Sequence, residues 1–562
     1  MPPKFSREVD QPTITTSGMI QQKRTSPCEA SCPAGNPIQK IHTLVQDNKF
    51  EEALTYLRSR NPLSGITGRI CPHFCQYNCN RNHYDEGVSI RAIEKFVADQ
   101  ADRTQTRMPF RGEPTGKTLA VIGSGPAGMT CAYFCALLGH KVTVFESSPI
   151  LGGMPRIGVP DFKLPKSIVD REIGHILQTG VTAVTNTTIG LDIPFADLRK
   201  DFDACLIAVG TWKEKRLDMN GADLVQPGVS FLKKVNFGLI KEIDGIVAVA
   251  GGGGVAYDCA LAARRLGASD VHIFCVEDEQ NSCAPAEDAD LARKEGITVH
   301  HSCVISGITA KNSSVHQIEY CSISFFNFDE CGRLSTCDSS SELKTMAVDM
   351  VISAIGLETD FTFLEQNSNL KFTPKQTLLV DPKTLQTDEE GVFGAGDAVT
   401  GPSSVAQAIG SGRQAALSIN QYLSQKDENT AQERIVIKPD STIVTQEIED
   451  LFDSHIVEFN EILNVEYHEK KARALPLDTH LAGGNGENIN KKDTVSESKR
   501  CLHCGHCISC GTCVEDCPGF VLDMRPSGPY VLYPEECWHC GCCRIACPTG
   551  AISYEFPLNM MV

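Results

Sequence analysis

Apolar and polar positions predict an α/β core in the middle of the chain. Leu119 to Ile122 form a short apolar run, the pattern of a buried strand, and a second such run ends at Glu146. A tight Gly123-x-Gly125-x-x-Gly128 turn and an apolar helical stretch lie between the two runs. Strand, glycine turn, helix and strand in this order predict a dinucleotide-binding unit.

The residue types in this turn have a physical reason. Glycine lets the backbone bend sharply and approach a pyrophosphate, so that the helix N-terminus, with Pro126 and Ala127, faces the anion. Glu146 then lies where a carboxylate accepts hydrogen bonds from a ribose. A glycine-rich turn alone also fits an ordinary loop, but here strand, helix and acid lie in register.

A second unit of the same kind spans Ile246 to Ala268, with a turn and first helical residues at Gly251, Gly253, Gly254, Val255 and Ala256. Downstream, the segment from Gly391 to Ala416 places Gly396 and Asp397 between an apolar strand and a helix. In flavoproteins with two dinucleotides, such a segment closes the FAD site around an inserted nicotinamide domain. We therefore assign FAD to the first turn and NAD(P) to the second, and expect Gly153 and Lys166, in the loop from Gly152 to Lys166, to lie near FAD.

Helical periodicity continues toward the N-terminus, where it is interleaved with cysteines. Ile38, Ile41, Leu44 and Val45 recur at spacings of three and four, which predicts an amphipathic helix. Candidate metal ligands flank this stretch: Cys28, Cys32, Cys71, Cys75, Cys79 and, on a further predicted helix, Glu94. Thiolates suit iron-sulfur clusters or zinc, and zinc stays open here, although closed zinc sites prefer paired two-residue spacings.

The C-terminal region carries the most specific cysteine pattern. Cys507, Cys510, Cys513 and Cys517 are followed by Cys537, Cys540, Cys543 and Cys547, each run with spacings of two, two and three residues and a closing Cys-Pro. This is the bacterial ferredoxin run twice over, in which the fourth cysteine ligates the other cluster. One 4Fe-4S cluster would take Cys547 with the first three cysteines, and the other Cys517 with Cys537, Cys540 and Cys543.

Composition narrows the class of protein. The chain of 562 residues is too long for one core, and its 26 cysteines, grouped at short spacings, indicate metal binding in a reducing compartment. A formal net charge of -18 argues against nucleic acid or anionic membrane as a partner. No apolar run is long enough for a membrane span and no secretory signal is evident, so a cytoplasmic location is expected.

These stretches together resemble the glutamate synthase small subunit family, which includes the N-terminal half of dihydropyrimidine dehydrogenase. The resemblance rests on GSGPAG, GGMPRIGVPDFKLPK, GGGGVAYD and GAGDAVTGPS and covers about residues 25 to 425 plus the segment before Cys501. It implies FAD, NAD(P)H and two N-terminal 4Fe-4S clusters. The C-terminal ferredoxin domain is an addition found in some members.

The sequence departs from the family at its N-terminus, where two expected cysteines are missing. SESKRCLHCGHC near the C-terminus carries Cys501 and Cys504 in the corresponding setting. We hypothesise that the two ends of the chain meet. One cluster would then be held by Cys501, Cys504, Cys28 and Cys79, and the other by Cys32, Cys71, Cys75 and Glu94. The alternative is a single N-terminal cluster with Cys501 and Cys504 as bystanders.

The second departure concerns the nicotinamide. Members that use NADPH commonly carry an arginine pair after the second strand of that domain, whereas here the strand is followed by Cys-Val-Glu-Asp-Glu, residues 275–279. A carboxylate accepts from two ribose hydroxyls and repels a 2′-phosphate. NADH is therefore expected over NADPH, with Glu277 as the acid, unless the run is only a solvated loop.

The expected architecture is multidomain α/β, with the NAD(P) Rossmann-like domain inserted in the FAD Rossmann-like domain. The expected parts are a helical iron-sulfur domain (1–111), the FAD domain (112–212 and 354–424), the NAD(P) domain (213–353), a helical linker (425–496) and an α+β ferredoxin domain (497–562). The expected function is an iron-sulfur flavoprotein oxidoreductase that exchanges electrons between NADH and a partner redox subunit within a hetero-oligomer. Alternatives are a self-sufficient NAD(P)H:ferredoxin oxidoreductase, the small subunit of a glutamate synthase, or a scaffold without turnover.

Overall fold

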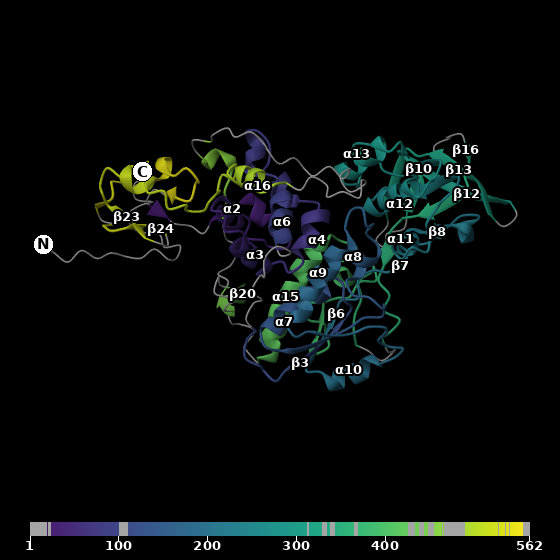
Figure 1. The fold of residues 1–562 in the computed structure, drawn as a ribbon, viewed down its shortest axis with the longest axis horizontal. Helices are drawn as coiled ribbons and strands as arrows, with labels where there is room; N and C mark the ends of the chain where they lie inside the picture. Colours follow the sequence, from purple (N-terminus) through teal and green to yellow (C-terminus); the bar gives the residue numbers. More distant parts are fainter. Residues whose placement is uncertain are drawn as a thin grey trace.

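The structure is a computed structural model, and it describes most of the chain. The described residues are 19–20, 24–100, 111–311, 314–328, 334–337, 343–364, 369–424, 433–437, 443–447, 455–462, 465, 489–525, 528–533, 536–538 and 540–554. Figure 1 shows the parts side by side, with the C-terminal domain at one end, the N-terminal helices and first sheet in the middle and the second sheet at the other end. None of the described helices is long and apolar enough to cross a membrane.

The first sheet is built from the apolar runs that the pattern predicts as strands. Its five strands are parallel in the order β19-β6-β3-β4-β5. They span Thr118–Ile122 (β3), Lys141–Phe145 (β4), Thr182–Val184 (β5), Ala204–Ile207 (β6) and Val392–Gly394 (β19). Strand β19 comes from far downstream, so the sheet closes only after the inserted domain is complete.

Helices cover this sheet and fix the glycine turn. Helix α7 (Pro126–Leu137) follows β3, and its residues from Ala127 to Leu137 are all buried beneath α15 (Val405–Leu423). A Cβ at Gly412 would lie 2.2 Å from the Ala127 carbonyl oxygen, so the two helices pack backbone to backbone. The remaining helices are α8 (Gly153–Ile157), α9 (Lys166–Gln178), α10 (Phe195–Asp201) and α14 (Asp397–Thr400).

The inserted part has a second parallel sheet in the order β11-β10-β9-β17-β8. Its strands are β8 (Gln226–Pro227), β9 (Ile246–Ala250), β10 (Asp270–Phe274), β11 (Thr298–His300) and β17 (Met350–Ser353). Its helices are η3 (Ala222–Leu224), α11 (Gly228–Asn236), α12 (Gly254–Arg265) and α13 (Ala286–Lys294). The strands β7 (Lys213–Glu214) and β18 (Leu357–Glu358) pair where the chain enters and leaves this part.

An antiparallel layer packs on the second sheet. It contains β12 (Cys303–Lys311), β13 (Ser314–Ser322) and β16 (Lys344–Ala347), and a separate hairpin pairs β14 (Phe325–Phe328) with β15 (Leu334–Cys337). Phe274 of the parallel sheet stacks on His300 and meets Tyr320 of β13 edge to face. Apolar side chains from both layers therefore share one core.

The N-terminal part is helical, as the periodicity predicts. Its elements are α1 (Pro27–Ala30), α2 (Ile38–Gln46), α3 (Phe50–Arg58), α4 (Ser64–Ile70), α5 (Phe74–Tyr77), η1 (Asn80–His83) and α6 (Ile90–Asp99). Ile38, Ile41, Leu44 and Val45 are all buried in its core, because one face of α2 packs on α3 and α16 (Lys491–Ser498).

Residues 425–496 differ from the helical linker expected from their charged stretches. Strands β20 (Glu433–Ile437) and β21 (Ile443–Glu447) form an antiparallel hairpin, and β22 (His455–Ile456) pairs with β2 (Arg24–Thr25). Only η5 (Phe459–Glu461) and α16 (Lys491–Ser498) are helical among the described residues there. The β-branched runs Ile435-Val436-Ile437 and Ile443-Val444-Thr445 favour strands, and this preference outweighs the charged residues around them. Much of this segment lies outside the described residues.

The C-terminal domain is small and holds its cysteines on loops and short helices. Its elements are α17 (Thr512–Glu515), β23 (Leu522–Arg525), β24 (Gly528–Val531), α18 (Cys542–Ala546) and β25 (Ser553–Tyr554). Strand β1 (Met19–Ile20) pairs antiparallel with β25. The beginning and the end of the chain therefore meet in one sheet.

Candidate functional site: two dinucleotide turns and four cysteine groups

The first glycine turn leaves open space before the N-terminus of α7. Gly123 has φ of 103°, and a Cβ there would lie 2.4 Å from the Ala208 carbonyl oxygen. A Cβ at Gly128 would lie 2.1 Å from the Gly123 carbonyl oxygen, whereas a Cβ at Gly125 would meet nothing within 4 Å. Gly123 and Gly128 therefore shape the turn, and Gly125 keeps the space in front of the helix free for a phosphate group.

Three separate segments meet at this turn. The Glu146 carboxylate accepts hydrogen bonds from the Ser124 amide at 3.0 Å and the Ser124 hydroxyl at 2.6 Å. A Cβ at Gly153 would lie 2.7 Å from Gly125 Cα, and one at Gly396 would lie 2.8 Å from Ala127 Cβ. The structure thus brings Glu146, Gly153 and Gly396 together at the first glycine turn, and the glycine-lined cradle fits a dinucleotide.

Asp397 begins α14 beside this cradle. Its carboxylate accepts a hydrogen bond from the Ser403 hydroxyl at 2.6 Å. Burial raises the pKa of the Asp397 carboxyl. The side chain is therefore held in place by its own loop.

The Lys166 side chain is engaged within its own loop. Its ammonium donates to the Val159 carbonyl and, at 3.5 Å, to the Pro155 carbonyl, so it closes its own loop. Burial lowers the pKa of Lys166 to about 8. The neighbouring Lys163 ammonium lies 2.5 Å from Asp258 of α12 and 2.7 Å from Asp288 of α13. This loop of the FAD half is thus tied to the inserted domain by a buried ion triad.

The second glycine turn repeats the geometry of the first. Gly251 has φ of 132°, and a Cβ there would lie 2.4 Å from the Ala354 carbonyl oxygen. A Cβ at Gly253 would meet nothing within 4 Å, and α12 begins at Gly254, with Val255 and Ala256 in its first turn. The space before α12 is therefore open to a second dinucleotide.

Glu277 lies over this second turn. A Cβ at Gly252 would lie 2.5 Å from Glu277 Oε2. This oxygen is buried and has no hydrogen-bond partner among the described residues. A buried carboxylate oxygen without a donor is costly, and ribose hydroxyls at this turn would satisfy it.

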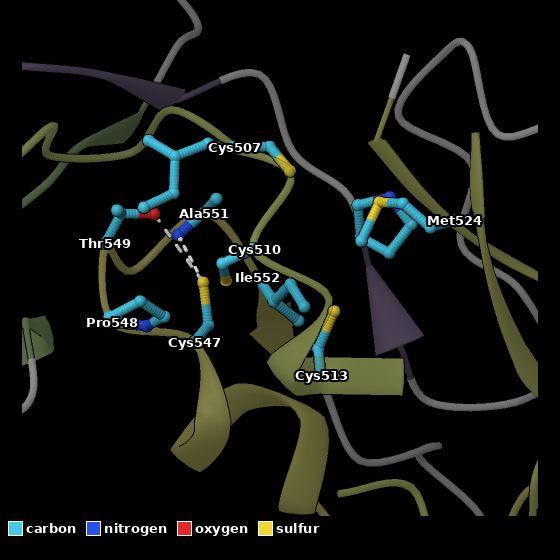
Figure 2. Close-up of a pocket in the computed structure, with 11 residues that line it drawn as sticks. Cys507, Cys510, Cys513, Met524, Cys547, Pro548, Thr549, Ala551 and Ile552 are labelled. Atoms are coloured by element: carbon cyan, nitrogen blue, oxygen red, sulfur yellow. Dashed lines mark hydrogen bonds between the residues drawn. The ribbon is translucent and has the colours of Figure 1, made fainter. Parts of the chain in front are cut away.

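The eight ferredoxin cysteines line two cavities. Figure 2 shows Cys507, Cys510, Cys513 and Cys547 around the first cavity, with Met524 and Ile552 on its wall. Cys517, Cys537, Cys540 and Cys543 line the second, together with Trp538 and Val531. The structure therefore sorts the thiols into the two quartets expected from the doubled run, with Cys517 and Cys547 exchanged between them.

Backbone and hydroxyl donors face these thiols. The amides of Ala551 and Ser509 donate to the sulfurs of Cys547 and Cys507 at 3.3 and 3.4 Å. The Thr512 hydroxyl donates to the Cys510 sulfur at 3.3 Å. Hydrogen bonds of this kind stabilise negative charge on cluster thiolates and tune the reduction potential.

The third cysteine group joins both ends of the chain. Cys28 and Cys79 lie near Cys501 and Cys504, and burial, together with the negative charges of neighbouring groups, raises the pKa of Cys28 and of Cys501. The Asn80 side-chain amide donates to the Cys504 sulfur at 3.5 Å, although Asn80 and Cys504 are 424 residues apart. Buried thiolates crowded in this way need a positive partner such as cluster iron.

Buried ion pairs fix the segment that carries Cys501 and Cys504. The Arg500 guanidinium pairs with Glu497 at 2.9 Å and with Asp85 at 3.0 Å, and the Glu497 carboxylate accepts from the Ser89 amide at 2.9 Å. The Arg81 guanidinium donates to the Arg500 carbonyl at 2.9 Å. Helix α16 consequently packs among the N-terminal helices, as Figure 1 shows.

The fourth group contains Cys32, Cys71, Cys75 and Glu94. Burial and the nearby Glu94 charge raise the pKa of Cys71 to about 12. The Glu94 carboxylate accepts hydrogen bonds from the Thr67 hydroxyl at 2.5 Å and the Asn61 amide at 3.2 Å, and burial raises its pKa to about 7. The four predicted side chains thus lie near enough for their charges to affect one another, in a largely buried region.

Helix α15 connects this fourth group with the FAD half. The buried Arg413 guanidinium donates to the Ala34 carbonyl at 2.5 Å, beside Cys32. A Cβ at Gly410 would lie 2.2 Å from the Pro33 carbonyl oxygen. Sequence reasoning missed Arg413 and Asn80, because each acts on a cysteine hundreds of residues away and no local spacing signals it.

Within the part of the chain that the structure describes, no three His, Cys, Asp or Glu side chains converge on a position for a single metal ion. In a 4Fe-4S cluster, by contrast, each iron takes its own thiolate.

Comparison with known families gives three matches. Residues 117–412 match the pyridine nucleotide-disulphide oxidoreductase family. Residues 13–106 match the family described as dihydropyrimidine dehydrogenase domain II, 4Fe-4S cluster, and residues 506–551 match the 4Fe-4S dicluster domain. The matches coincide with the two dinucleotide turns, the N-terminal thiol groups and the C-terminal quartets.

Three proteins are similar in sequence to this chain over most of its length. The NADP(+)-dependent formate dehydrogenase subunit beta of Moorella thermoacetica is 35% identical over 71% of this chain and 60% of its own length. The subunit PreT of the NAD-dependent dihydropyrimidine dehydrogenase of Salmonella typhimurium is 29% identical over 71% of this chain and 92% of its own length. The glutamate synthase [NADPH] small chain of Azospirillum brasilense is 31% identical over 71% of this chain and 87% of its own length.

Proposed function

Because the chain belongs to the pyridine nucleotide-disulphide oxidoreductase family, we propose that it passes electrons between NADH and a partner redox subunit through FAD and four 4Fe-4S clusters. The chain is an NAD(P)H-dependent oxidoreductase with FAD and 4Fe-4S domains. The preference for NADH, the number of clusters and the partner are the proposed part.

The observation that carries the proposal is the order of the four thiol groups. Arg413 of the FAD half contacts the loop of Cys32. In the next group, Cys28 is four residues before Cys32, and Cys79 is four residues after Cys75. Cys504 of that group is three residues from Cys507 of the ferredoxin domain. The groups therefore form one series from the FAD half to the far end of the ferredoxin domain.

The junction in this series is fixed by hydrogen bonds. The Gly505 amide donates to the Thr549 carbonyl at 2.7 Å, and the Thr549 hydroxyl donates to the His506 carbonyl at 2.8 Å. The Gln39 side chain donates to the Cys504 carbonyl at 2.9 Å. The chain thus holds the ferredoxin domain against the N-terminal thiol groups by its backbone.

A flavin supplies the conversion between a two-electron hydride and single electrons, which clusters accept one at a time. The chain's own residues bind the cofactors and orient them. The two open turns receive the pyrophosphates, and buried donors such as the Asn80 amide stabilise the thiolates. No side chain is assigned a proton-transfer role.

Glu277 supports NADH as the nucleotide. Its unpartnered oxygen lies at the turn where a ribose would bind, and a carboxylate there accepts from hydroxyls and repels a 2′-phosphate. Two of the three relatives above are named for NADP(+) or NADPH and one for NAD. The relatives' names do not agree on one nucleotide, so the proposal of NADH rests on Glu277 of this chain.

The partner is proposed from the relatives, whose names describe a beta subunit, a subunit and a small chain. The thiol-rich composition favours a reducing compartment, and we place the protein in the cytoplasm on that ground. Anaerobic purification of the tagged chain from its own cell tests the partner. A catalytic subunit that co-purifies in stoichiometric amount supports the proposal. Full turnover of NADH with ferredoxin by the isolated chain would contradict it and favour a self-sufficient enzyme.

A further inference from the structure

Arg91 of α6 contacts two parts of the molecule with different proposed roles. One guanidinium nitrogen donates to the Cys71 carbonyl at 3.0 Å, and another lies 2.7 Å from both carboxylate oxygens of Glu287 in α13. The Arg91 and Glu287 side chains are 12% and 27% exposed. This largely buried ion pair therefore links the loop of a cluster cysteine to the nicotinamide domain.

Helix α13 also borders the nicotinamide turn. A Cβ at Gly254, the first residue of α12, would lie 3.8 Å from Pro285, which precedes α13. Asp288 in the first turn of α13 pairs with Lys163 of the FAD half at 2.7 Å. A dinucleotide at the glycine turn would therefore bind next to the helix that carries Glu287.

The charge of Arg91 acts on the fourth thiol group. The guanidinium opposes the charge of Cys71 and of Glu94, which lies one helical turn further along α6. Reduction of a cluster adds one negative charge, so a nearby cation favours the reduced state and a nearby anion disfavours it. Glu287 offsets the Arg91 cation only while α13 holds this position.

From these contacts we propose that Arg91 and Glu287 couple nucleotide binding to the reduction potential of the cluster held by Cys32, Cys71, Cys75 and Glu94. This inference rests on the proposed function, since it requires that cluster. Coupling is reciprocal, so the factor by which nucleotide changes the reduced-to-oxidised ratio is the factor by which reduction changes nucleotide affinity. Arg91 acts as a positioning residue, because it touches neither nucleotide nor cluster iron.

The test is an anaerobic redox titration of the full chain followed by electron paramagnetic resonance. Glu94→Cys first identifies the signal of this cluster, because a changed ligand alters its shape. The titration is then repeated with ADP-ribose, which carries the ribose and pyrophosphate without the nicotinamide ring. We expect ADP-ribose to change the reduced-to-oxidised ratio at fixed potential by about fivefold, the low end of typical coupling, which is ~41 mV for one electron.

Three variants separate charge from position. Glu287→Gln leaves Arg91 unopposed and raises the midpoint potential, whereas Arg91→Gln lowers it. Arg91→Lys keeps the charge but cannot contact Cys71 and Glu287 together, so it keeps a near-native potential and loses the effect of ADP-ribose. Asp290→Asn is the matched control, because Asp290 lies on the same helix in an exposed pair with Arg293.

The outcomes distinguish a failure of the cluster assignment from a failure of the coupling. If Glu94→Cys alters no signal and Cys71→Ser leaves the iron content unchanged, the cluster assignment fails and the coupling fails with it. If the assignment holds but ADP-ribose shifts the potential equally in the wild type and in Arg91→Lys, the coupling through Arg91 is overturned. Equilibrium dialysis of ADP-ribose against oxidised and reduced protein gives an independent value for the same factor.

Discussion

The side chain of Gln39 in α2 donates a hydrogen bond to the backbone carbonyl of Cys504, 465 residues further along the chain. The contact lies between the two ends of the protein, at the point where Cys28 and Cys79 approach Cys501 and Cys504. It fixes the C-terminal segment at the N-terminal thiols.

This relationship gives the first prediction. The double variant Cys501→Ser, Cys504→Ser should lose one cluster, about four iron atoms per FAD, because two of its four thiolates are gone. Iron and flavin analysis of anaerobically purified protein measures the ratio. Cys131→Ser is the control, since Cys131 is buried in α7. An unchanged ratio in the double variant would leave Cys501 and Cys504 as bystanders.

The second prediction concerns the exchange of Cys517 between the two ferredoxin cavities. Cys517→Ser should remove the same paramagnetic signal as Cys540→Ser, because both side chains line the second cavity. Cys542→Ser should leave both signals in place, since Cys542 lines neither cavity. If Cys517→Ser instead removes the signal that Cys507→Ser removes, Cys517 is a ligand in the first cavity.

The third prediction separates two glycines of one turn. Gly125→Ala should fold normally but bind FAD more weakly, because its Cβ has open space that the pyrophosphate would occupy. Gly128→Ala should destabilise the domain itself, because its Cβ would lie 2.1 Å from the Gly123 carbonyl oxygen. Thermal unfolding of the flavin-free protein, with FAD titration by fluorescence, distinguishes the two effects. Equal melting temperatures for the two variants would contradict the prediction that only Gly128→Ala destabilises the domain.

The fourth prediction concerns Glu277. Glu277→Gln removes a charge-assisted acceptor worth about 1.5–3 kcal/mol, so NADH should bind roughly 10- to 150-fold more weakly. Stopped-flow bleaching of the flavin at low NADH concentration measures the loss. Asp278→Asn is the control, because the exposed Asp278 is engaged with Asn281 at 2.8 Å. If the wild type is reduced faster by NADPH than by NADH, Glu277 does not select the nucleotide.

The fifth prediction is a pH dependence at His140. Its Nδ1 lies 2.8 Å from the Thr115 hydroxyl and its Nε2 lies 3.0 Å from Asn420 Oδ1, and burial lowers the pKa of His140 below its usual value. A lowered folded pKa means that its stabilisation is complete above about pH 6.5, the unfolded value. The stabilisation is lost as the pH falls through the folded value.

Thermal release of flavin between pH 5 and pH 8 tests this dependence. The release temperature of the wild type should fall toward pH 5, and the fall should be smaller in His140→Gln, which has no group to protonate. His316→Gln, at an exposed position in β13, should behave like the wild type. If the release temperatures of the wild type and of His140→Gln fall in parallel with pH, His140 is not the source of the pH dependence.

Local sequence is sufficient to predict the two dinucleotide turns and the two groups of ferredoxin cysteines. In both cases residues close in sequence create the feature: Gly123 and Gly128 shape one turn, and Cys507, Cys510 and Cys513 enter one cavity. The meeting of the chain ends needed the resemblance to a family, because spacing cannot show that Cys504 lies near Asn80.

Features that depend on contacts between domains were not foreseen. The Lys163 ammonium pairs with Asp258 and Asp288 across a domain boundary, and nothing in the loop sequence signals these partners. The Arg91–Glu287 pair has no sequence signal either, since single charges on helix surfaces are common. The hairpin of β20 and β21 was missed because charged residues outweighed the short β-branched runs in the expectation of a helix.

The cysteine group shared by the two ends of the chain has a consequence for biosynthesis. Cys28 and Cys79 leave the ribosome early, whereas Cys501 and Cys504 are made more than 400 residues later, so the proposed four-thiol site cannot be complete until Cys504 has been made. A polypeptide that stops before Cys501 lacks half of the thiolates. If these four thiols hold a cluster, its insertion requires translation past Cys504, and a chain terminated before Cys501 cannot hold it.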